Sequence, residues 1–241
     1  VKLDGSPPAH AAANVDVVDL EGRGTACLVW SSALQADRGL QLRYIDLHGP
    51  DKPNLLASVD NNRGLVTRTR YVASTTFYLR DRLEGRPWAT CLPYPVQVVD
   101  RVETHDQISQ QKAVRYYAYH HGYHDARERE FRGFGMVETW DTESFEDFVH
   151  GGLFTFDQFE TVEENLHQPP VHTKSWFHTG AFLGRDRLST LFASEYWSGD
   201  ASEPDLSDTL LPTGLTGAEA REAIRALAGS TLRTEVYALD G

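Results

Sequence analysis

Three histidines and an aspartate lie close together in the sequence, at His120, His121, His124 and Asp125. Imidazole and carboxylate groups are common zinc ligands, so a metal-dependent hydrolase built on His120, His124 and Asp125 is one hypothesis. On a β-strand, however, neighbouring side chains point to opposite faces, so His120 and His121 could share an ion only at a bulge. No second cluster of ligands elsewhere completes a site. The sequence therefore favours a turn that carries partly buried histidines, and it predicts no metal or other cofactor.

A second candidate for cation binding is the turn from Asp19 to Gly24, with the sequence DLEGRG. It resembles the calcium loops of β-propeller blades, in which oxygens at alternate positions surround the ion. Arg23 occupies a position where a ligand is needed, and its fixed positive charge opposes a cation. Glu21 replaces the usual asparagine. We therefore expect the shape of the turn without the calcium ion.

The remaining residues that could do chemistry form weaker patterns. A carbohydrate-binding β module is a further hypothesis, because aromatic rings can stack on sugars. The tyrosines that suggest it are Tyr116, Tyr117, Tyr119 and Tyr123. Packing between sheets is the favoured interpretation of these rings. Pairs of acidic residues are frequent enough to arise by chance, and we expect them on solvated faces. The sequence contains no nucleophile elbow, phosphate-binding glycine loop or Cys-x-x-Cys pair.

The elements that would position these residues are mostly β-strands. Runs of β-branched and aromatic residues predict strands at 15–20, 26–30, 40–47, 55–59, 65–72, 96–104, 113–121, 131–139, 171–179 and 231–239. Turn-forming residues at 60–64 and 122–125 predict hairpins. Residues 141–168 lack a clear period, and we expect an irregular but ordered excursion there. The predicted fold class is mainly β, with antiparallel hairpins and a curved sheet.

One short helix is predicted on the C-terminal side, near residues 217–228. Thr216 and Glu219 have the spacing of a capping box. Apolar residues then recur at helical spacing, and Gly229 lies where a helix-terminating glycine belongs.

Composition limits the function classes. The chain has 35 acidic and 23 basic residues, a net charge of −12, which disfavours binding to nucleic acids and anionic membranes. No apolar run approaches the roughly 20 residues that cross a bilayer. The mean hydropathy of −0.44 suits a sheet with wet faces. Cys27 and Cys91 are expected to be two free buried thiols or one bridge. Because the chain begins at Val1 with no visible signal peptide, we expect a piece of a longer protein.

The segment from Arg127 to Glu138 is distinctive, with the sequence REREFRGFGMVE. Together with residues 117–125, it resembles the middle region of the TcdB/SpvB family, the B component of Tc toxin complexes. Further stretches agree in the same order, at 69–75, 85–88, 92–96, 169–180 and 232–240. Residues 54–241 are thus similar to that middle region. Residues 1–53 resemble, more weakly, the edge of the preceding β-propeller or a β segment that links to it.

The resemblance implies a structural role. In this family the B component and a C component form a hollow β-sheet cocoon of RHS, or YD-repeat, character that encloses a toxic polypeptide. The B component's propeller docks onto the A component, a membrane-penetrating channel. The chain is therefore expected to be non-catalytic and to form part of the wall of the shell in a secreted insecticidal complex. The expected partners are the C component, the enclosed polypeptide and, through the neighbouring propeller, the A component. Nucleic-acid binding and direct membrane insertion are not expected.

No catalytic residue is predicted, and the candidate residues are structural. Those expected to be most sensitive to substitution are Trp88, Arg132, Gly133, Phe134, Gly135 and Trp176. Glycines among aromatic residues would let a sheet bend or allow a neighbouring backbone to approach. An isolated piece of shell would expose strand edges, so we also expect self-association.

Overall fold

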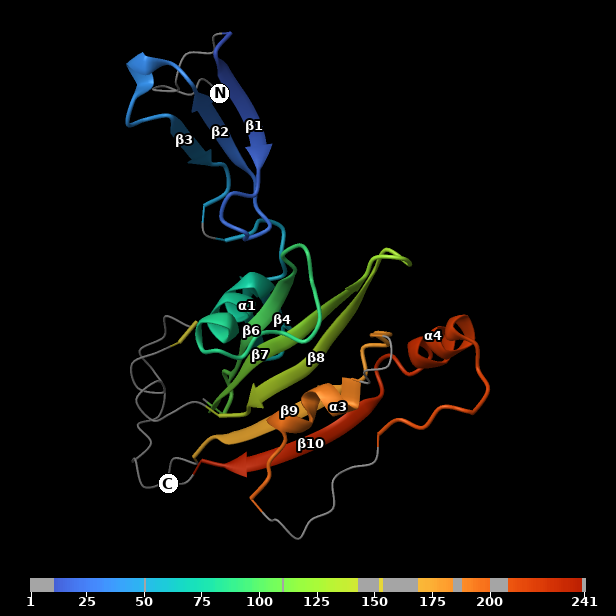
Figure 1. Cartoon of the computed structure of the whole chain (residues 1–241). Helices are drawn as coiled ribbons and strands as arrows, with labels where there is room; N and C mark the ends of the chain where they lie inside the picture. The colour runs from blue at the N-terminus through green and yellow to red at the C-terminus, as the bar shows by residue number, and fades with distance from the viewer. Residues whose placement is uncertain are drawn as a thin grey trace.

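The computed structural model describes residues 11–49, 51–109, 111–142, 152–153, 169–183, 188–199 and 208–239. These residues form two antiparallel sheets, a small one near the N-terminus and a larger one that holds most of the chain (Figure 1). The fold is mainly β, which confirms the class predicted from the alternating sequence. No helix in the described ranges is long and apolar enough to cross a membrane.

The small sheet has the strand order β1-β2-β3. Its strands are β1 (Ala13–Val18), β2 (Cys27–Ser32) and β3 (Leu42–Asp46), with a short 3-10 helix, η1 (Gln35–Asp37), before β3. The turn between β1 and β2 contacts the beginning of the helix at 74–83 and the first residue of strand β6 (Gln97–Asp106). Thr75 Oγ1 donates to the carbonyl of Gly22 at 2.5 Å, and Gln97 Nε2 donates to the carbonyl of Arg23 at 2.5 Å.

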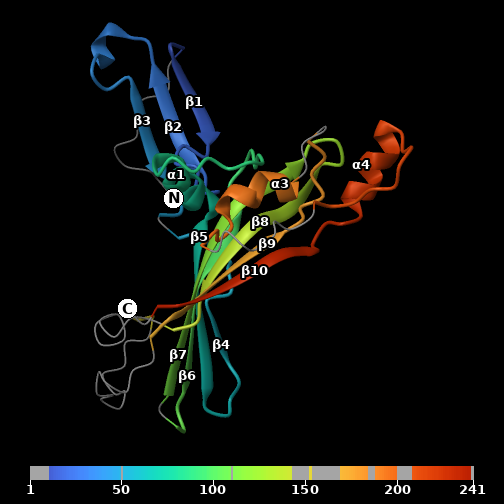
Figure 2. The same cartoon turned by 60° about the horizontal axis from the view of Figure 1, so that its bottom comes forward.

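The large sheet is a meander in which each strand pairs with the next, in the order β10-β9-β8-β7-β6-β5-β4. Its strands are β4 (Ser58–Asp60), β5 (Leu65–Ala73), β6 (Gln97–Asp106), β7 (Gln111–Asp125), β8 (Glu130–Trp140), β9 (Val171–Phe177) and β10 (Thr231–Ala238). The register shifts in three strand pairs, β5–β6, β7–β8 and β9–β10. Such bulges increase the local twist and curve a sheet. The predicted strands overlap the observed ones, with bounds that differ by a few residues. The sheet is strongly twisted (Figure 2).

The helices lie in the connections between strands. They are α1 (Ser74–Leu83), α3 (Leu188–Phe192), α4 (Gly217–Arg225) and a 3-10 turn, η3 (Ala193–Glu195). The predicted helix is confirmed as α4, and its capping box is present. Glu219 N donates to Thr216 Oγ1 at 3.3 Å, and Thr216 N donates to Glu219 Oε2 at 2.8 Å. The helix ends three residues earlier than predicted, at Arg225.

Helix α1 was not expected from the sequence. Its N-cap is Ala73, which supplies no capping side chain, and its buried side chains are Ser74, Phe77 and Asp81. Such a narrow and partly polar face lacks the apolar periodicity by which amphipathic helices are found. Tertiary packing stabilises α1 instead, since Phe77 forms a small core with Val98 and Ala118.

The predicted turn at 122–125 is wrong, because β7 continues to Asp125. The chain reverses just after it, where Arg129 has a left-handed φ of 55°. Gly122 has a different role, close packing. A Cβ atom there would lie 2.7 Å from Trp88 Cζ3 and 2.9 Å from Leu92 Cδ2. Most of the predicted excursion at 141–168 lies outside the described residues.

Two small apolar cores lie on one face of the large sheet. Phe77, Val98 and Ala118 pack beneath α1, and Met136, Trp176, Ala181 and Phe192 pack beneath α3. Figures 1 and 2 show α1 and α3 on the same side of the sheet. The space between the two helices is lined by a mixture of charged, polar and apolar groups.

Candidate functional site

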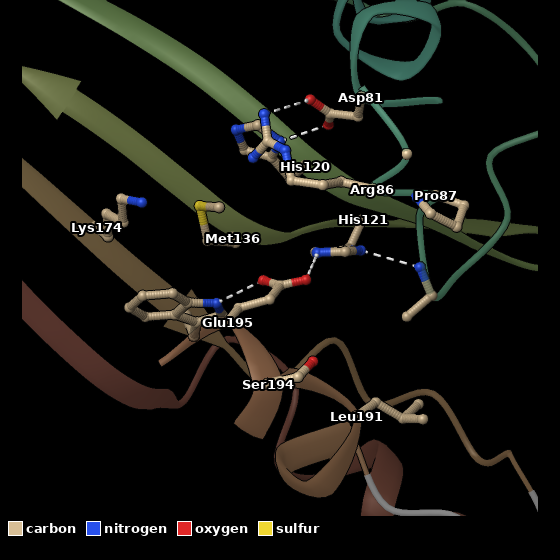
Figure 3. Close-up of a pocket in the computed structure, with 13 residues that line it drawn as sticks. Asp81, Arg86, Pro87, His120, His121, Met136, Lys174, Leu191, Ser194 and Glu195 are labelled. Carbon is tan, nitrogen blue, oxygen red and sulfur yellow. Dashed lines mark hydrogen bonds and ion pairs between the residues drawn. The ribbon is translucent and has the colours of Figure 1, made fainter. Parts of the chain in front are cut away.

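A pocket of about 420 Å³ separates α1 and the loop after it from α3 and η3 (Figure 3). Its floor is formed by β7, β8 and β9. The residues that define its chemistry are Asp81, His120, His121, Met136, Trp176 and Glu195. The two histidines that begin the sequence-predicted cluster therefore both line this pocket.

His120 lies between two carboxylates. Its side chain is 2% exposed; Nδ1 is 2.5 Å from Asp81 Oδ2, and Nε2 is 3.0 Å from Glu138 Oε1. Burial opposes a charge on the imidazole, but the contacts with Asp81 and Glu138 outweigh burial and raise the pKa of His120. An imidazolium presents one N–H to each carboxylate, so this arrangement favours the protonated ring.

Asp81 connects α1 to the sheet and to the following loop. Its Oδ2 also accepts a hydrogen bond from Trp88 Nε1 at 2.8 Å. Its Oδ1 lies 3.5 Å from Arg80 Nη2 and 3.7 Å from Arg86 Nη2. Burial would raise the pKa of Asp81, but the hydrogen bonds from His120 and Trp88 lower it overall. The buried aspartate is therefore held as a carboxylate.

Glu138 extends the network from β8 to β9. Its Oε2 lies 2.5 Å from His172 Nε2. Burial alone would raise the pKa of Glu138, but the hydrogen bond with His120 and the charges of His120, Lys174 and His172 lower it to about 2. The His172 ring stacks on Trp140, with ring centroids 4.4 Å apart. A chain of contacts thus runs from α1 through β7 and β8 to β9.

His121 forms a separate pair on the opposite side of the pocket. The backbone N–H of Ala89 donates to His121 Nδ1 at 3.0 Å, so the ring proton lies on Nε2. His121 Nε2 is 2.8 Å from Glu195 Oε1, and Trp176 Nε1 donates to Glu195 Oε2 at 3.0 Å. Burial would raise the pKa of Glu195, but the hydrogen bond from His121 helps to lower it. These bonds attach η3 to the sheet.

Comparison with known proteins identifies the architecture. Residues 4–163 match the family model described as the insecticide toxin TcdB middle/N-terminal region. The chain belongs to this family. The resemblance inferred from the sequence is thereby confirmed.

Solved Tc toxin structures resemble this TcdB middle region over nearly its whole length. A structure of the Photorhabdus luminescens Tc holotoxin pore matches with 28% identity and a TM-score of 0.75, covering 100% of this chain and 11% of that chain. A TcdB2-TccC3 complex matches with 29% identity and a TM-score of 0.73, covering 94% and 10%. The same complex without its hypervariable C-terminal region matches with 29% identity and a TM-score of 0.74, covering 97% of this chain and 10% of that chain. The chain spans about a tenth of these matched chains. No curated protein matches it.

On a regular strand His120 and His121 would point to opposite faces, but this TcdB-family chain has the irregularity that was expected to be the exception. His121 has a left-handed φ of 55°, and the β7–β8 register shifts between Gly122 and His124. This irregularity interrupts the alternation and lets both rings line one pocket.

The proposed zinc ligands are nevertheless not brought together. His124 contacts the Tyr94 ring at 5.1 Å, and Asp125 lies 3.0 Å from Arg221 Nη2. In the ranges that the structure describes, no group of three or more histidines, cysteines or acidic residues is placed to hold a metal ion. The hydrolase hypothesis therefore has no metal centre among these residues.

The other sequence-predicted sites in this TcdB middle region have structural explanations. Both carboxylate oxygens of Asp19 accept backbone hydrogen bonds, from Arg23 N at 2.9 Å and Gly24 N at 2.7 Å. The turn resembling a calcium loop is thus closed by its own amides. The Tyr119 hydroxyl donates to the carbonyl of Val99 at 2.8 Å, and its ring packs against Phe134 at 4.9 Å. Tyr119 therefore contributes to packing.

The two tryptophans expected to be structurally sensitive occupy matching positions. Trp88 donates its indole N–H to Asp81, and Trp176, which is 0% exposed, donates its indole N–H to Glu195. Each indole thus donates to a carboxylate at the pocket, and the Trp176 ring itself lines it. The sequence signalled the tryptophans but did not reveal the carboxylates with which they pair.

The segment from Arg132 to Gly135 combines three local roles. The Arg132 side chain is 7% exposed, and its Nη2 lies 3.7 Å from Asp125 Oδ2. Phe134 packs edge-on against Trp88, with ring centroids 6.1 Å apart. Gly133 has a left-handed φ of 83°, whereas a Cβ on Gly135 would lie 2.7 Å from Phe192 Cζ. One glycine is thus needed for backbone conformation and the other for space.

The acidic residues of the network were not predicted as site residues. Asp81, Glu138 and Glu195 come from separate elements and share no local motif. The period-two pattern of β8 does place Glu138 on the same face as the buried Met136. An acidic residue at a core position of a strand is the one sequence signal that could have indicated this part of the network.

Proposed function

We propose that the chain is a non-catalytic wall segment of a Tc toxin shell. Residues 54–241 form the wall, and residues 1–53 form the edge of a preceding β-propeller or the segment that links to it. The observation that carries this proposal is the large sheet. Among the described residues it is an open meander whose outer strands, β4 and β10, each pair on one side only. Further strands can therefore extend it in both directions.

The buried network supports a structural role over catalysis. The carboxylate of Asp81 is engaged by His120 and Trp88, and that of Glu195 is engaged by His121 and Trp176. A catalytic acid or base must have a proton path to a substrate, whereas Asp81 Oδ2 and both oxygens of Glu195 attach α1 and η3 to the sheet. The arrangement supplies fixed geometry for a wall.

The proposed partners follow from the assemblies that the chain resembles. The matched structures are a Tc holotoxin and TcdB2-TccC3 complexes. We infer that the full-length protein associates with a C component, that the shell encloses a toxic polypeptide, and that the neighbouring propeller meets an A-component channel. The complex would act outside the producing cell, as a secreted insecticidal toxin.

A strand-edge variant tests this function. Val236 on β10 is 66% exposed, so Val236→Pro perturbs the strand without removing a buried side chain. The full-length protein is co-expressed with its C component, and complex formation and protease resistance of the enclosed polypeptide are measured. We expect Val236→Pro to lose both, and the matched Val236→Thr, which suits a strand, to keep both. Normal enclosure by the proline variant would refute the role of β10 in the wall.

A further inference from the structure

The buried network links four elements of the fold, and the His120 imidazole lies at its centre. Asp81 comes from α1, His120 from β7, Glu138 from β8 and His172 from β9, and the four form a continuous chain of contacts. The relative exposures of Asp81, His120 and Glu138 are 1%, 2% and 7%. Two buried carboxylates therefore share one ring, Asp81 through a hydrogen bond and Glu138 through an ion pair.

We propose that His120, Asp81 and Glu138 form a charge clamp that holds α1 against the sheet in mildly acidic solution and loosens in alkaline solution. The clamp is a conformational device of the wall, separate from strand pairing at its edges.

The geometry makes the proton on His120 decisive. When the ring is an imidazolium, Nδ1 donates to Asp81 and the charged ring forms an ion pair with Glu138, whose Oε1 lies 3.0 Å from Nε2. When the ring is neutral, one nitrogen carries a lone pair that faces a buried carboxylate. The carboxylate that faces this lone pair keeps only its other hydrogen-bond partner, Trp88 for Asp81 or His172 for Glu138. A buried charge with fewer partners is less stable, so loss of the proton weakens the attachment of α1.

Charged groups on the adjoining elements do not replace that proton. On the α1 side, Arg80 and Arg86 lie 3.5 and 3.7 Å from Asp81 Oδ1, outside normal hydrogen-bond geometry. On the β9 side, Lys174 is the register partner of Glu138, and the His172 ring occupies the other oxygen, Oε2. The positive charges of Arg80, Arg86 and Lys174 partly offset the negative charges of the carboxylates. They do not occupy the positions that face the His120 ring.

The second histidine pair lies next to the clamp. The ring centroids of His121 and His120 are 6.4 Å apart, and the charge of His120 contributes to lowering the pKa of Glu195 on η3. Deprotonation of His120 therefore also removes a favourable charge from Glu195. The loosening is expected to be strongest at α1 and weaker at η3, where His121 and Trp176 still donate.

The direction of the pH dependence follows from the shifts. The pKa of His120 is raised above 6.5, so its stabilising contribution is complete below that pH and is lost as pH rises through the raised value. The pKa of Asp81 is lowered from 3.8, and that of Glu138 from 4.5 to about 2. The stabilising contributions of Asp81 and Glu138 are complete above their ordinary pKa values of 3.8 and 4.5, and they are lost only as the pH falls through the lowered values. The clamp is therefore tightest between about pH 4.5 and pH 6.5.

Hydrogen–deuterium exchange of the full-length protein, analysed by mass spectrometry, tests the clamp. Peptides covering α1 (Ser74–Leu83) are followed from about pH 6 to about pH 9, after correction for intrinsic exchange rates. We expect the opening equilibrium of α1 to rise about tenfold for each unit by which the pKa is raised. His120→Gln should make α1 less protected at every pH and remove the pH dependence.

Two further variants make the result decisive. Asp81→Asn removes one of the two carboxylates, so the loss of protection should begin at a lower pH. His124→Gln is the matched control, because His124 lies on the same strand and contacts Tyr94; it should keep the wild-type profile. Protection of α1 that does not change with pH in the wild type would overturn the proposal, as would an unaltered pH profile in both His120→Gln and Asp81→Asn. The measurement does not depend on the C component, so it fails or succeeds independently of the wall function.

Discussion

Gly135 provides the sharpest test of how the wall is packed. A Cβ atom at this position would lie 2.7 Å from Phe192 Cζ and 3.0 Å from His121 Cβ. Ordinary contact begins at 3.4 Å, so Phe192 would have to move by about 0.7 Å. Phe192 is 0% exposed in the core beneath α3, and its displacement must propagate to other buried side chains. We expect Gly135→Ala to destabilise this region by about 1 to 3 kcal/mol, the usual cost of overpacking.

Two other glycines serve as controls, because they separate steric crowding from backbone strain. Gly133 has a φ of 83°, and no atom lies within 4 Å of the place that a Cβ would take, so Gly133→Ala should cost about 1 to 2 kcal/mol through conformation alone. Gly217 begins α4 in open space, and Gly217→Ala should be neutral or slightly stabilising. Local opening free energies from hydrogen exchange of β8 peptides measure the effects at Gly135 and Gly133, and α4 peptides measure the effect at Gly217.

A double-mutant cycle with Phe192→Leu decides between the two mechanisms. The smaller side chain vacates the space that an alanine at Gly135 needs, so the two substitutions should be coupled by about 1 kcal/mol or more. Phe192→Leu combined with Gly133→Ala should show no coupling, because that strain is independent of Phe192. Additive effects in the Gly135 cycle, or a neutral Gly135→Ala, would refute the steric argument.

Two further predictions concern buried polar groups and thiols. Trp176→Phe keeps an aromatic ring but removes the hydrogen bond to Glu195, so it should cost about 1.5 to 3 kcal/mol in local stability by hydrogen exchange, whereas Trp197→Phe at a 49% exposed position should change stability by less than about 0.5 kcal/mol. Cys91 is an exposed free thiol and Cys27 is a buried one. A thiol reagent should therefore label Cys91 in the native protein and Cys27 only after unfolding. Equal labelling rates would contradict the burial of Cys27.

Much of the sheet was predictable because its signals are local. Alternation of apolar and polar residues located the strands of both sheets, and the Thr216 capping box located α4. Where strand prediction failed, at 122–125, Gly122 was interpreted as a turn residue. Glycine serves equally where a neighbour approaches closely, and that neighbour, Trp88, lies far away in the sequence. Local pattern cannot distinguish these two uses.

Helix α1 and the histidine network were not predictable because their causes are long-range. His120 contacts Asp81, which lies 39 positions earlier in the chain and is separated from it by the loop after α1 and strand β6. The sequence drew attention to the correct histidines, but it grouped His120 with His124 and Asp125, its neighbours along the strand. The structure instead divides these residues among three environments. A cluster in sequence becomes a site only if the backbone turns the side chains toward one another.

The polar network explains why β7 adopts one register in spite of its many aromatic residues. In the observed register His120 is opposite Met136, and its ring lies between Asp81 and Glu138. A slip by one residue would turn His120 to the other face and present Tyr119 to the two buried carboxylates. An apolar core would tolerate that exchange, because rings fill space on either face. Unpaired carboxylates would not, since a buried charge without a partner is costly. We infer that the network fixes the register of β7 in the wall, which the apolar cores alone would leave less sharply defined.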